Sequence, residues 1–124
     1  MERELKKVAL SIVMMEDKPR VNISAYTTPV GGLVVAPLHE IVWSKTGERI
    51  VKRQRNWCIW TYPVGLRLLG GFPEKQQAVD FSVQYLAKYS WVALVKDDIL
   101  KNNDMDAMRK DFMGYRKLIA DTYK

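Results

Sequence analysis

The sequence predicts an α+β fold, in which an antiparallel sheet of about five strands is followed by helices on one face. Over residues 5–72, apolar residues recur with period two, which is typical of strands. After residue 72 the apolar spacing changes to three and four, which predicts amphipathic helices over about 74–89 and 104–123. The length of 124 residues and the hydrophobic content of 48% suit a single domain, 1–124, with its own core.

The first two alternating segments predict a β-hairpin. From Leu5 to Met15, apolar residues stand on both faces of the expected strand, which favours a central position in the sheet. Residues 16–19 are polar and include a proline, so they predict a turn. The alternation then resumes over residues 21–28, which predicts the second strand.

Three further strands complete the expected sheet. The segment 33–43 reads as extended, and because Pro37 lacks a backbone N–H we expect a bulge or a sheet edge at that residue. A loop that opens at residues 46–47 is expected to carry the basic residues that follow. A fourth strand is expected over 57–62, and a short last strand over 66–72.

The first helix follows directly on the sheet. Pro73 suits the first turn of a helix, where its missing N–H is not needed. Val79, Val83 and Leu86 recur at helical spacing, so we expect them to face the sheet. Residues 90–101 are expected to form a connector that contains a short helix.

The C-terminal helix has the clearest periodicity in the chain. Asn103 is the expected N-cap, with Asp104 and Asp106 in the first turn, where acidic side chains are favourable. The expected apolar stripe consists of Met105, Met108, Phe112, Tyr115 and Ile119.

The net charge of +6 is concentrated in one part of the chain. Residues 45–72 hold six basic residues and one acid, a net charge of +5. Residues 1–44 are neutral overall, and residues 73–124 carry +1. A basic stretch of this kind is typical of proteins that bind polyanions such as nucleic acids.

Aromatic residues flank the basic stretch, and the two together predict a binding surface. Phosphates attract cations, while unstacked bases stack on flat rings at roughly 1 to 3 kcal/mol each. The candidate residues for binding nucleic acid or another partner are Lys45, Arg49, Lys52, Arg53, Arg55, Trp57, Trp60, Tyr62 and Arg67. The alternative is that the tryptophans anchor a core or a dimer, and that the charges form a solvated hairpin tip.

The tryptophans are expected to divide between core and recognition. On the fourth strand, Trp57 and Ile59 face one way while Trp60 and Tyr62 face the other, so at most one face is expected to be core. The alternation alone does not decide which face that is. Trp91 lies in an apolar run and is expected to be buried, whereas Trp57 adjoins the basic residues and is the candidate for base stacking.

No catalytic or metal centre is expected. His39 and Glu40 are neighbours on a strand, so their side chains point to opposite sides, and no nucleophile joins them. Cys58 is expected to be a small buried residue. One cysteine excludes an intrachain disulfide, and with one histidine it cannot supply a zinc tetrad. We therefore expect no enzymatic activity, no cofactor and no metal.

The leading interpretation is a non-enzymatic domain that binds nucleic acid, with single-stranded DNA or RNA favoured, through the 45–67 hairpin and exposed aromatics. The alternative is a small inhibitor or adaptor of phage or plasmid type that binds an acidic surface on another protein. No apolar run reaches the ~18 residues needed to span a bilayer, and the start lacks the apolar region of a signal peptide, so a cytoplasmic protein without a membrane partner is expected. The proline-interrupted strand 33–43 and the methionines of the last helix also favour a homodimer.

Overall fold

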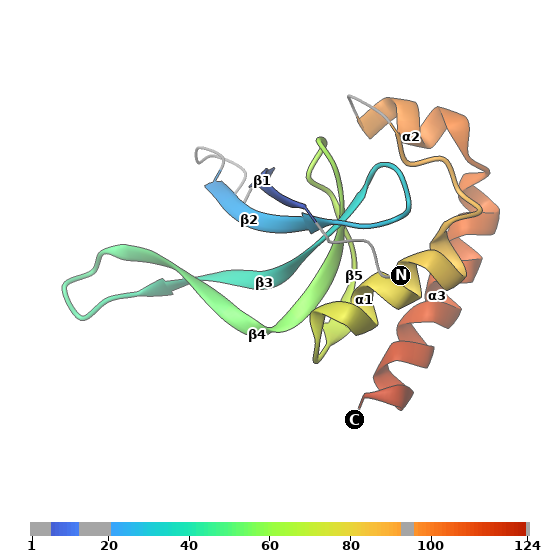
Figure 1. Cartoon of the computed structure of the whole chain (residues 1–124). Helices are drawn as coiled ribbons and strands as arrows, with labels where there is room; N and C mark the ends of the chain where they lie inside the picture. The colour runs from blue at the N-terminus through green and yellow to red at the C-terminus, as the bar shows by residue number, and fades with distance from the viewer. Residues whose placement is uncertain (1–5, 13–20, 93–95, 124) are drawn as a thin grey trace.

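In the computed structural model, five strands form one antiparallel sheet in the order β1-β2-β3-β4-β5 (Figure 1). The structure describes residues 6–12, 21–92 and 96–123, with the backbone alone at positions 12, 21, 40, 41, 49, 51, 52 and 96. The strands are β1 (Lys7–Ile12), β2 (Val21–Thr27), β3 (Leu33–Trp43), β4 (Arg49–Thr61) and β5 (Arg67–Phe72). The helices are α1 (Lys75–Phe81), the π-helical turn η1 (Ser82–Leu86), α2 (Lys96–Asn102) and α3 (Met105–Thr122). The predicted α+β class, a sheet followed by helices, is confirmed.

The predicted hairpin of the first two strands is confirmed, but β1 lies at the edge of the sheet and pairs only with β2 among the described residues, so the central position expected for it is wrong. β1 pairs with β2 from Lys7 opposite Tyr26 to Ile12 opposite Val21. On β2, Ile23 is buried while the residues on either side of it are exposed, as a strand with one covered face requires. The predicted turn at 16–19 lies outside the described residues.

The fourth strand is much longer than the sequence predicts. β4 begins at Arg49, so the basic residues from 49 to 55 lie on a strand, and the prediction of a loop there is wrong. The turn is confined to Ser44–Glu48, where the N–H of Ser44 donates to the carbonyl of Glu48 at 2.8 Å. The ladder continues outward because β3 also extends to Trp43, which lies opposite Arg49, and Lys52 and Arg53 likewise have partners on β3.

Pro37 marks a bulge, as the sequence predicts. Pro37 lies opposite Trp57, whereas His39 lies opposite Arg53, so one residue of β3 faces three residues of β4. Extra residues on one strand bend it and increase its twist. The bulge separates the body of the sheet from the outer part of the β3–β4 hairpin.

Both faces of the sheet are buried in the body of the molecule. Ile59 packs with the helices in one cluster, while Trp60 packs in a second cluster with residues of β1, β2 and β3 on the opposite face. Ile59 is fully buried and Trp60 is 7% exposed. The expectation that only one face of this strand is core is therefore wrong, because helices cover one face and the curled strands β1 and β2 pack on the other (Figure 1).

The first helix is shorter than predicted and ends in a π turn. Pro73 precedes the N-cap Glu74 and so stands outside the first turn, contrary to the prediction. The N–H of Glu74 donates to the side chain of Gln77 at 3.0 Å, which is one half of a capping box. Val83, which lies in the π turn, is 47% exposed instead of facing the sheet, so this part of the prediction is wrong.

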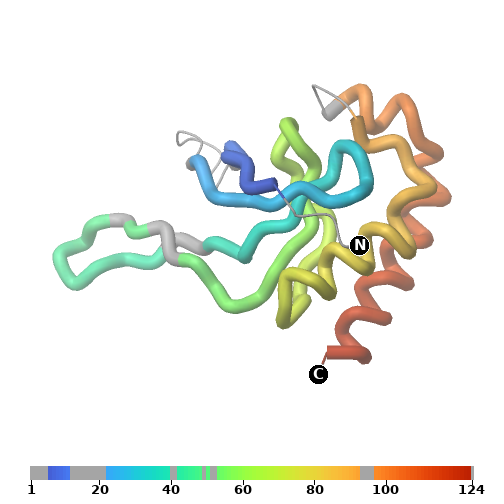
Figure 2. The backbone as a smooth tube through the Cα atoms, viewed as in Figure 1, coloured from blue at the N-terminus to red at the C-terminus, as the bar shows by residue number. Residues whose placement is uncertain are grey.

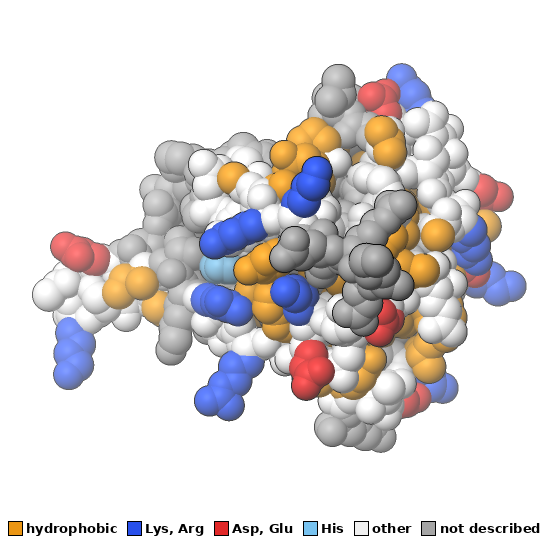
Figure 3. All heavy atoms as spheres, in the orientation of Figure 1, with side chains coloured by type: hydrophobic (Ala, Val, Ile, Leu, Met, Phe, Trp, Pro, Cys, Tyr) orange, Lys and Arg blue, Asp and Glu red, His pale blue; other side chains and the backbone are white. Residues whose placement is uncertain are grey.

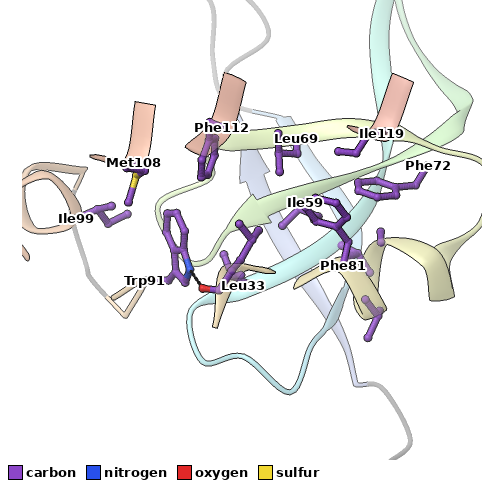
Figure 4. Packing of buried hydrophobic residues seen from close by; sticks show 14 residues of the cluster. Leu33, Ile59, Leu69, Phe72, Phe81, Trp91, Ile99, Met108, Phe112 and Ile119 are labelled. Carbon is purple, nitrogen blue, oxygen red and sulfur yellow. Dashed lines mark hydrogen bonds between the residues drawn. The ribbon is translucent and has the colours of Figure 1, made fainter. Parts of the chain in front are cut away.

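Helix α3 completes the core (Figure 4). Met108, Phe112 and Ile119 are buried, as the apolar stripe predicts. Its N-cap is Asp104, whose side chain accepts from the N–H of Ala107 at 3.2 Å. Asn103, the predicted cap, instead donates through its side-chain amide to the carbonyl groups of Ser90 and Ile99, 2.8 Å away in each case. It therefore links the segment before α2 to α2 itself. None of the helices in the described ranges is long and apolar enough to cross a membrane.

Candidate nucleic-acid interface

The outer part of the β3–β4 hairpin extends from the body as a two-stranded arm, residues 39–53 (Figure 2). The arm begins at the bulge and ends in the turn at 44–48. Near its tip Trp43 is 67% exposed, and Lys45 in the turn is exposed as well. The arm therefore presents an aromatic ring and a cation to solvent, away from the core.

A pocket of about 410 Å³ lies where the arm joins the body, and we call it the tryptophan pocket. Val35 and Ile59 are covered by the helices, whereas Pro37 and Trp57, next along the same face of the same strands, line the pocket. The helices thus cover one part of this sheet face and leave the part beside the arm open.

Two aromatic rings in the tryptophan pocket each lie beside a cation. The Tyr26 and Trp57 rings have centroids 6.1 Å apart and are tilted by 51°. The Nζ atom of Lys75 lies 4.2 Å from the centroid of Tyr26, and the Cζ atom of Arg53 lies 5.5 Å from that of Trp57. At these distances each cation is attracted to the ring by about 0.5 to 1 kcal/mol. Positive charge is therefore held directly against flat apolar surface.

Lys7 and Arg53 give the pocket a net positive charge. Lys7 and His39 line it together with Arg53, and none of its described lining residues is acidic. His39 is fixed by a 2.8 Å hydrogen bond between its Nδ1 atom and the carbonyl of Pro37. Lys7 and Arg53 are exposed, and within the described ranges neither forms an ion pair. Their charges are therefore available to an anionic partner.

The same grouping is visible on the surface of the molecule. In Figure 3 several lysine and arginine side chains surround the histidine, beside hydrophobic surface, at the base of the arm. Acidic side chains lie mostly away from the histidine on this view. The arm and the tryptophan pocket thus form one positively charged face.

Comparison with protein-family models, with curated proteins and with solved structures found no match for this chain.

Of the residues predicted to bind a partner, the structure brings Arg53 and Trp57 together in the tryptophan pocket. Arg55 is exposed in the bulged segment of β4, next to the pocket in sequence. Lys45 lies in the turn of the arm. Arg49 and Lys52 lie on the part of β4 that belongs to the arm, and the structure describes only their backbone.

The other predicted residues lie elsewhere. Trp60 is buried in the core on the opposite face, where its indole N–H has no acceptor within the described part of the chain. Tyr62, 37% exposed, lies in the turn that follows β4 and does not line the pocket. Arg67 is exposed on β5 and lines a different hollow. These three residues do not contribute to the tryptophan pocket.

Sequence reasoning missed three residues that line the pocket, Lys7, Tyr26 and His39, and also Lys75, which lies over the Tyr26 ring. They come from β1, β2, β3 and α1, and each is a single basic or aromatic residue in an otherwise ordinary segment. The alternation of β2 does place Tyr26 on one face with Asn22 and Ser24, which was the available signal. The register that sets Tyr26 beside Trp57 is a long-range property of the sheet.

Cys58 and the acidic residues form no site of chemical interest among the described residues. Cys58 is 2% exposed, and burial raises the pKa of its thiol, while the Arg67 guanidinium lowers that pKa by a smaller amount. Within the described ranges no group of three His, Cys, Asp or Glu side chains could hold a metal ion.

Proposed function

We propose that this protein binds single-stranded nucleic acid, with bases in the tryptophan pocket and phosphates on the cations around it. The observation that carries the proposal is the pair of neighbouring rings, Tyr26 and Trp57, each with a cation over it, in an open pocket whose described lining contains no acid. This combination suits a ligand that is flat and apolar at one point and anionic at the next. A nucleotide strand has that alternation along its whole length.

The aromatic pair favours a single strand over a duplex. A base can stack on a protein ring only when its own face is uncovered, and each such stack is worth roughly 1 to 3 kcal/mol. In a duplex, both faces of each base are covered by the neighbouring base pairs. A base could also lie on the guanidinium plane of Arg53, which is itself held over the Trp57 ring.

Cations on the arm and next to it support the proposal. Lys45 and Arg55 are exposed, and no described residue forms an ion pair with either of them. Contacts from such cations to phosphates do not depend on base sequence, and they weaken steeply as salt is added. We therefore infer a binding protein with little sequence preference, and the proposal includes no catalytic step.

The proposal is tested by fluorescence anisotropy of a labelled oligothymidylate, as a single strand and as a duplex with its complement. We expect tighter binding of the single strand. Tyr26→Leu should weaken single-strand binding by roughly 1 to 3 kcal/mol, because a stacking ring is lost. Tyr62→Leu is the matched control, since Tyr62 is exposed but lies outside the pocket.

Two results would overturn the proposal. One is equal affinity for single strand and duplex, or no greater loss for Tyr26→Leu than for Tyr62→Leu. The other is a pull-down from lysate in which the protein retains no nucleic acid but retains a specific protein partner, also after nuclease treatment. That result would instead support an inhibitor or adaptor that binds an acidic protein surface.

A further inference from the structure

A second basic hollow, of about 430 Å³, lies on the other face of β4, and we call it the arginine pocket. Asn56 and Cys58 line it, whereas Trp57 between them lines the tryptophan pocket. Consecutive residues of a strand point to opposite faces, so the two pockets lie on opposite sides of the same strand.

The arginine pocket owes its floor to two consecutive glycines of β5. A Cβ atom at Gly70 would lie 2.8 Å from the Sγ atom of Cys58, so only glycine fits there without displacing the thiol. Gly71 has a φ of +97°, which side-chain-bearing residues rarely adopt. Because neither residue has a side chain, a ligand can approach the backbone between β4 and α3.

Two arginines from distant parts of the chain supply its charge. Arg67 belongs to β5 and Arg116 to α3, and both are exposed and line the pocket. None of the described residues that line the pocket is acidic, and no described carboxylate pairs with either guanidinium. Arg67 also lies close enough to Cys58, another lining residue, for its charge to lower the pKa of the thiol against the larger effect of burial. Guanidinium groups present forked N–H donors that match the oxygens of a phosphate group.

The outer edge of β4 connects the two pockets. Within the described residues β5 pairs with β4 only between Trp57 and Trp60, so β4 has no neighbouring strand on that side before Trp57. Arg55, which is exposed, lies on this stretch of β4. The unpaired edge of β4 with its exposed Arg55 therefore offers a strand a route from the tryptophan pocket to the arginine pocket.

We propose that the arginine pocket binds phosphate groups of the same nucleic-acid strand whose bases occupy the tryptophan pocket. This inference rests on the proposed function and extends it, because it makes the interface wrap around β4 from one face of the sheet to the other. A strand long enough to reach both pockets gains phosphate contacts that a short strand cannot make.

The test compares oligothymidylates of about 4 and about 16 nucleotides, the limits of known site sizes for one domain. Arg67→Gln/Arg116→Gln should weaken binding of the long strand and flatten its slope of log affinity against log salt by about 1.4 to 2 units, for two phosphate contacts. Binding of the short strand should not change. Arg109→Gln/Lys117→Gln removes the same charge from exposed positions of α3 outside the pocket and is the matched control.

The outcomes separate this inference from the proposed function. If the wild type binds both strands, and the Arg67/Arg116 variant behaves like the control with each of them, the arginine pocket has no role and the tryptophan pocket stands. Thymidine monophosphate that shifts the NMR signals of Gly70 and Gly71 would show that the arginine pocket binds a nucleotide. If the Arg67/Arg116 variant nevertheless binds the long strand as tightly as the wild type does, the pocket still has no role in strand binding. If the wild type binds neither strand, the proposed function fails and this inference fails with it. Unchanged thermal unfolding of both variants shows that folding is not the cause.

Discussion

Two tryptophans in one fold have different surroundings and different expected roles. Trp91 is 1% exposed, its Nε1–H donates to the carbonyl of Leu86 at 2.8 Å, and its ring packs near that of Phe112 (Figure 4). Trp57 is half-buried, packs against the same core on one side and lies under the Arg53 guanidinium on the other. The prediction that Trp91 is buried is confirmed. The recognition role of Trp57 stays a prediction.

Substitution of the two residues should separate stability from binding. Trp91→Ala should lower the free energy of unfolding by roughly 3 to 5 kcal/mol, the usual cost of emptying a large aromatic site. Trp57→Leu keeps apolar bulk but loses the flat ring, so it should lower single-strand affinity by roughly 1 to 3 kcal/mol with a much smaller loss of stability. Denaturant unfolding and anisotropy titration measure the two quantities. A Trp57→Leu protein that unfolds as readily as Trp91→Ala, or binds like the wild type, would contradict the assignment.

At the scale of elements, the turn between β2 and β3 is fixed by its contact with the segment around Trp91. Gly32 has a φ of +86°, and a Cβ atom there would lie 2.5 Å from the carbonyl carbon of Trp91. Gly47, in the turn of the arm, has a φ of +83°, but a Cβ atom there would meet nothing within 4 Å. The two glycines therefore share a backbone conformation and differ in their surroundings.

This difference gives a matched pair of substitutions. Gly47→Ala should cost about 1 to 2 kcal/mol of stability, which is the steric cost of the left-handed conformation. Gly32→Ala should cost clearly more, because the backbone of residues 31–33 or of Trp91 must also move. Thermal unfolding of both proteins measures the costs. Equal costs would show that the turn and the Trp91 segment are not in tight contact.

The elements differ in how far the sequence determines them. The period-two alternation on β2 and the apolar stripe of α3 predict these elements well, because burial on one face leaves a regular pattern. The first half of β4 has no such pattern, and none of the arm side chains that the structure describes is buried. Its extended conformation depends on pairing with β3, and the local sequence pattern does not show which strands pair. Val83 likewise shows that helical spacing alone does not decide which side of a short helix is covered, because that depends on the elements packed against it.

At the scale of the whole molecule, the tryptophan pocket is lined by residues of four strands, β1, β2, β3 and β4, and Lys75 of α1 lies over one of its rings. The charge distribution of the sequence indicates the β4 contribution, because most of the excess charge lies near that strand. The other four contributions arise from register and from where the helices stop. The homodimer expected from strand 33–43 and the last helix stays a prediction, which the mass in solution tests.

The central claim is that the positively charged face formed by the arm and the tryptophan pocket holds phosphates. Lys52→Gln/Arg53→Gln/Arg55→Gln removes three cations of β4, and Arg109→Gln/Lys110→Gln/Lys117→Gln removes three from exposed positions of α3. The most direct measurement is the slope of log affinity against log salt for a single-stranded oligothymidylate. The β4 variant should flatten this slope by about 2 to 3 units, and the α3 variant should leave it close to that of the wild type. An unchanged slope for the β4 variant, or an equal flattening in both variants, would contradict the claim.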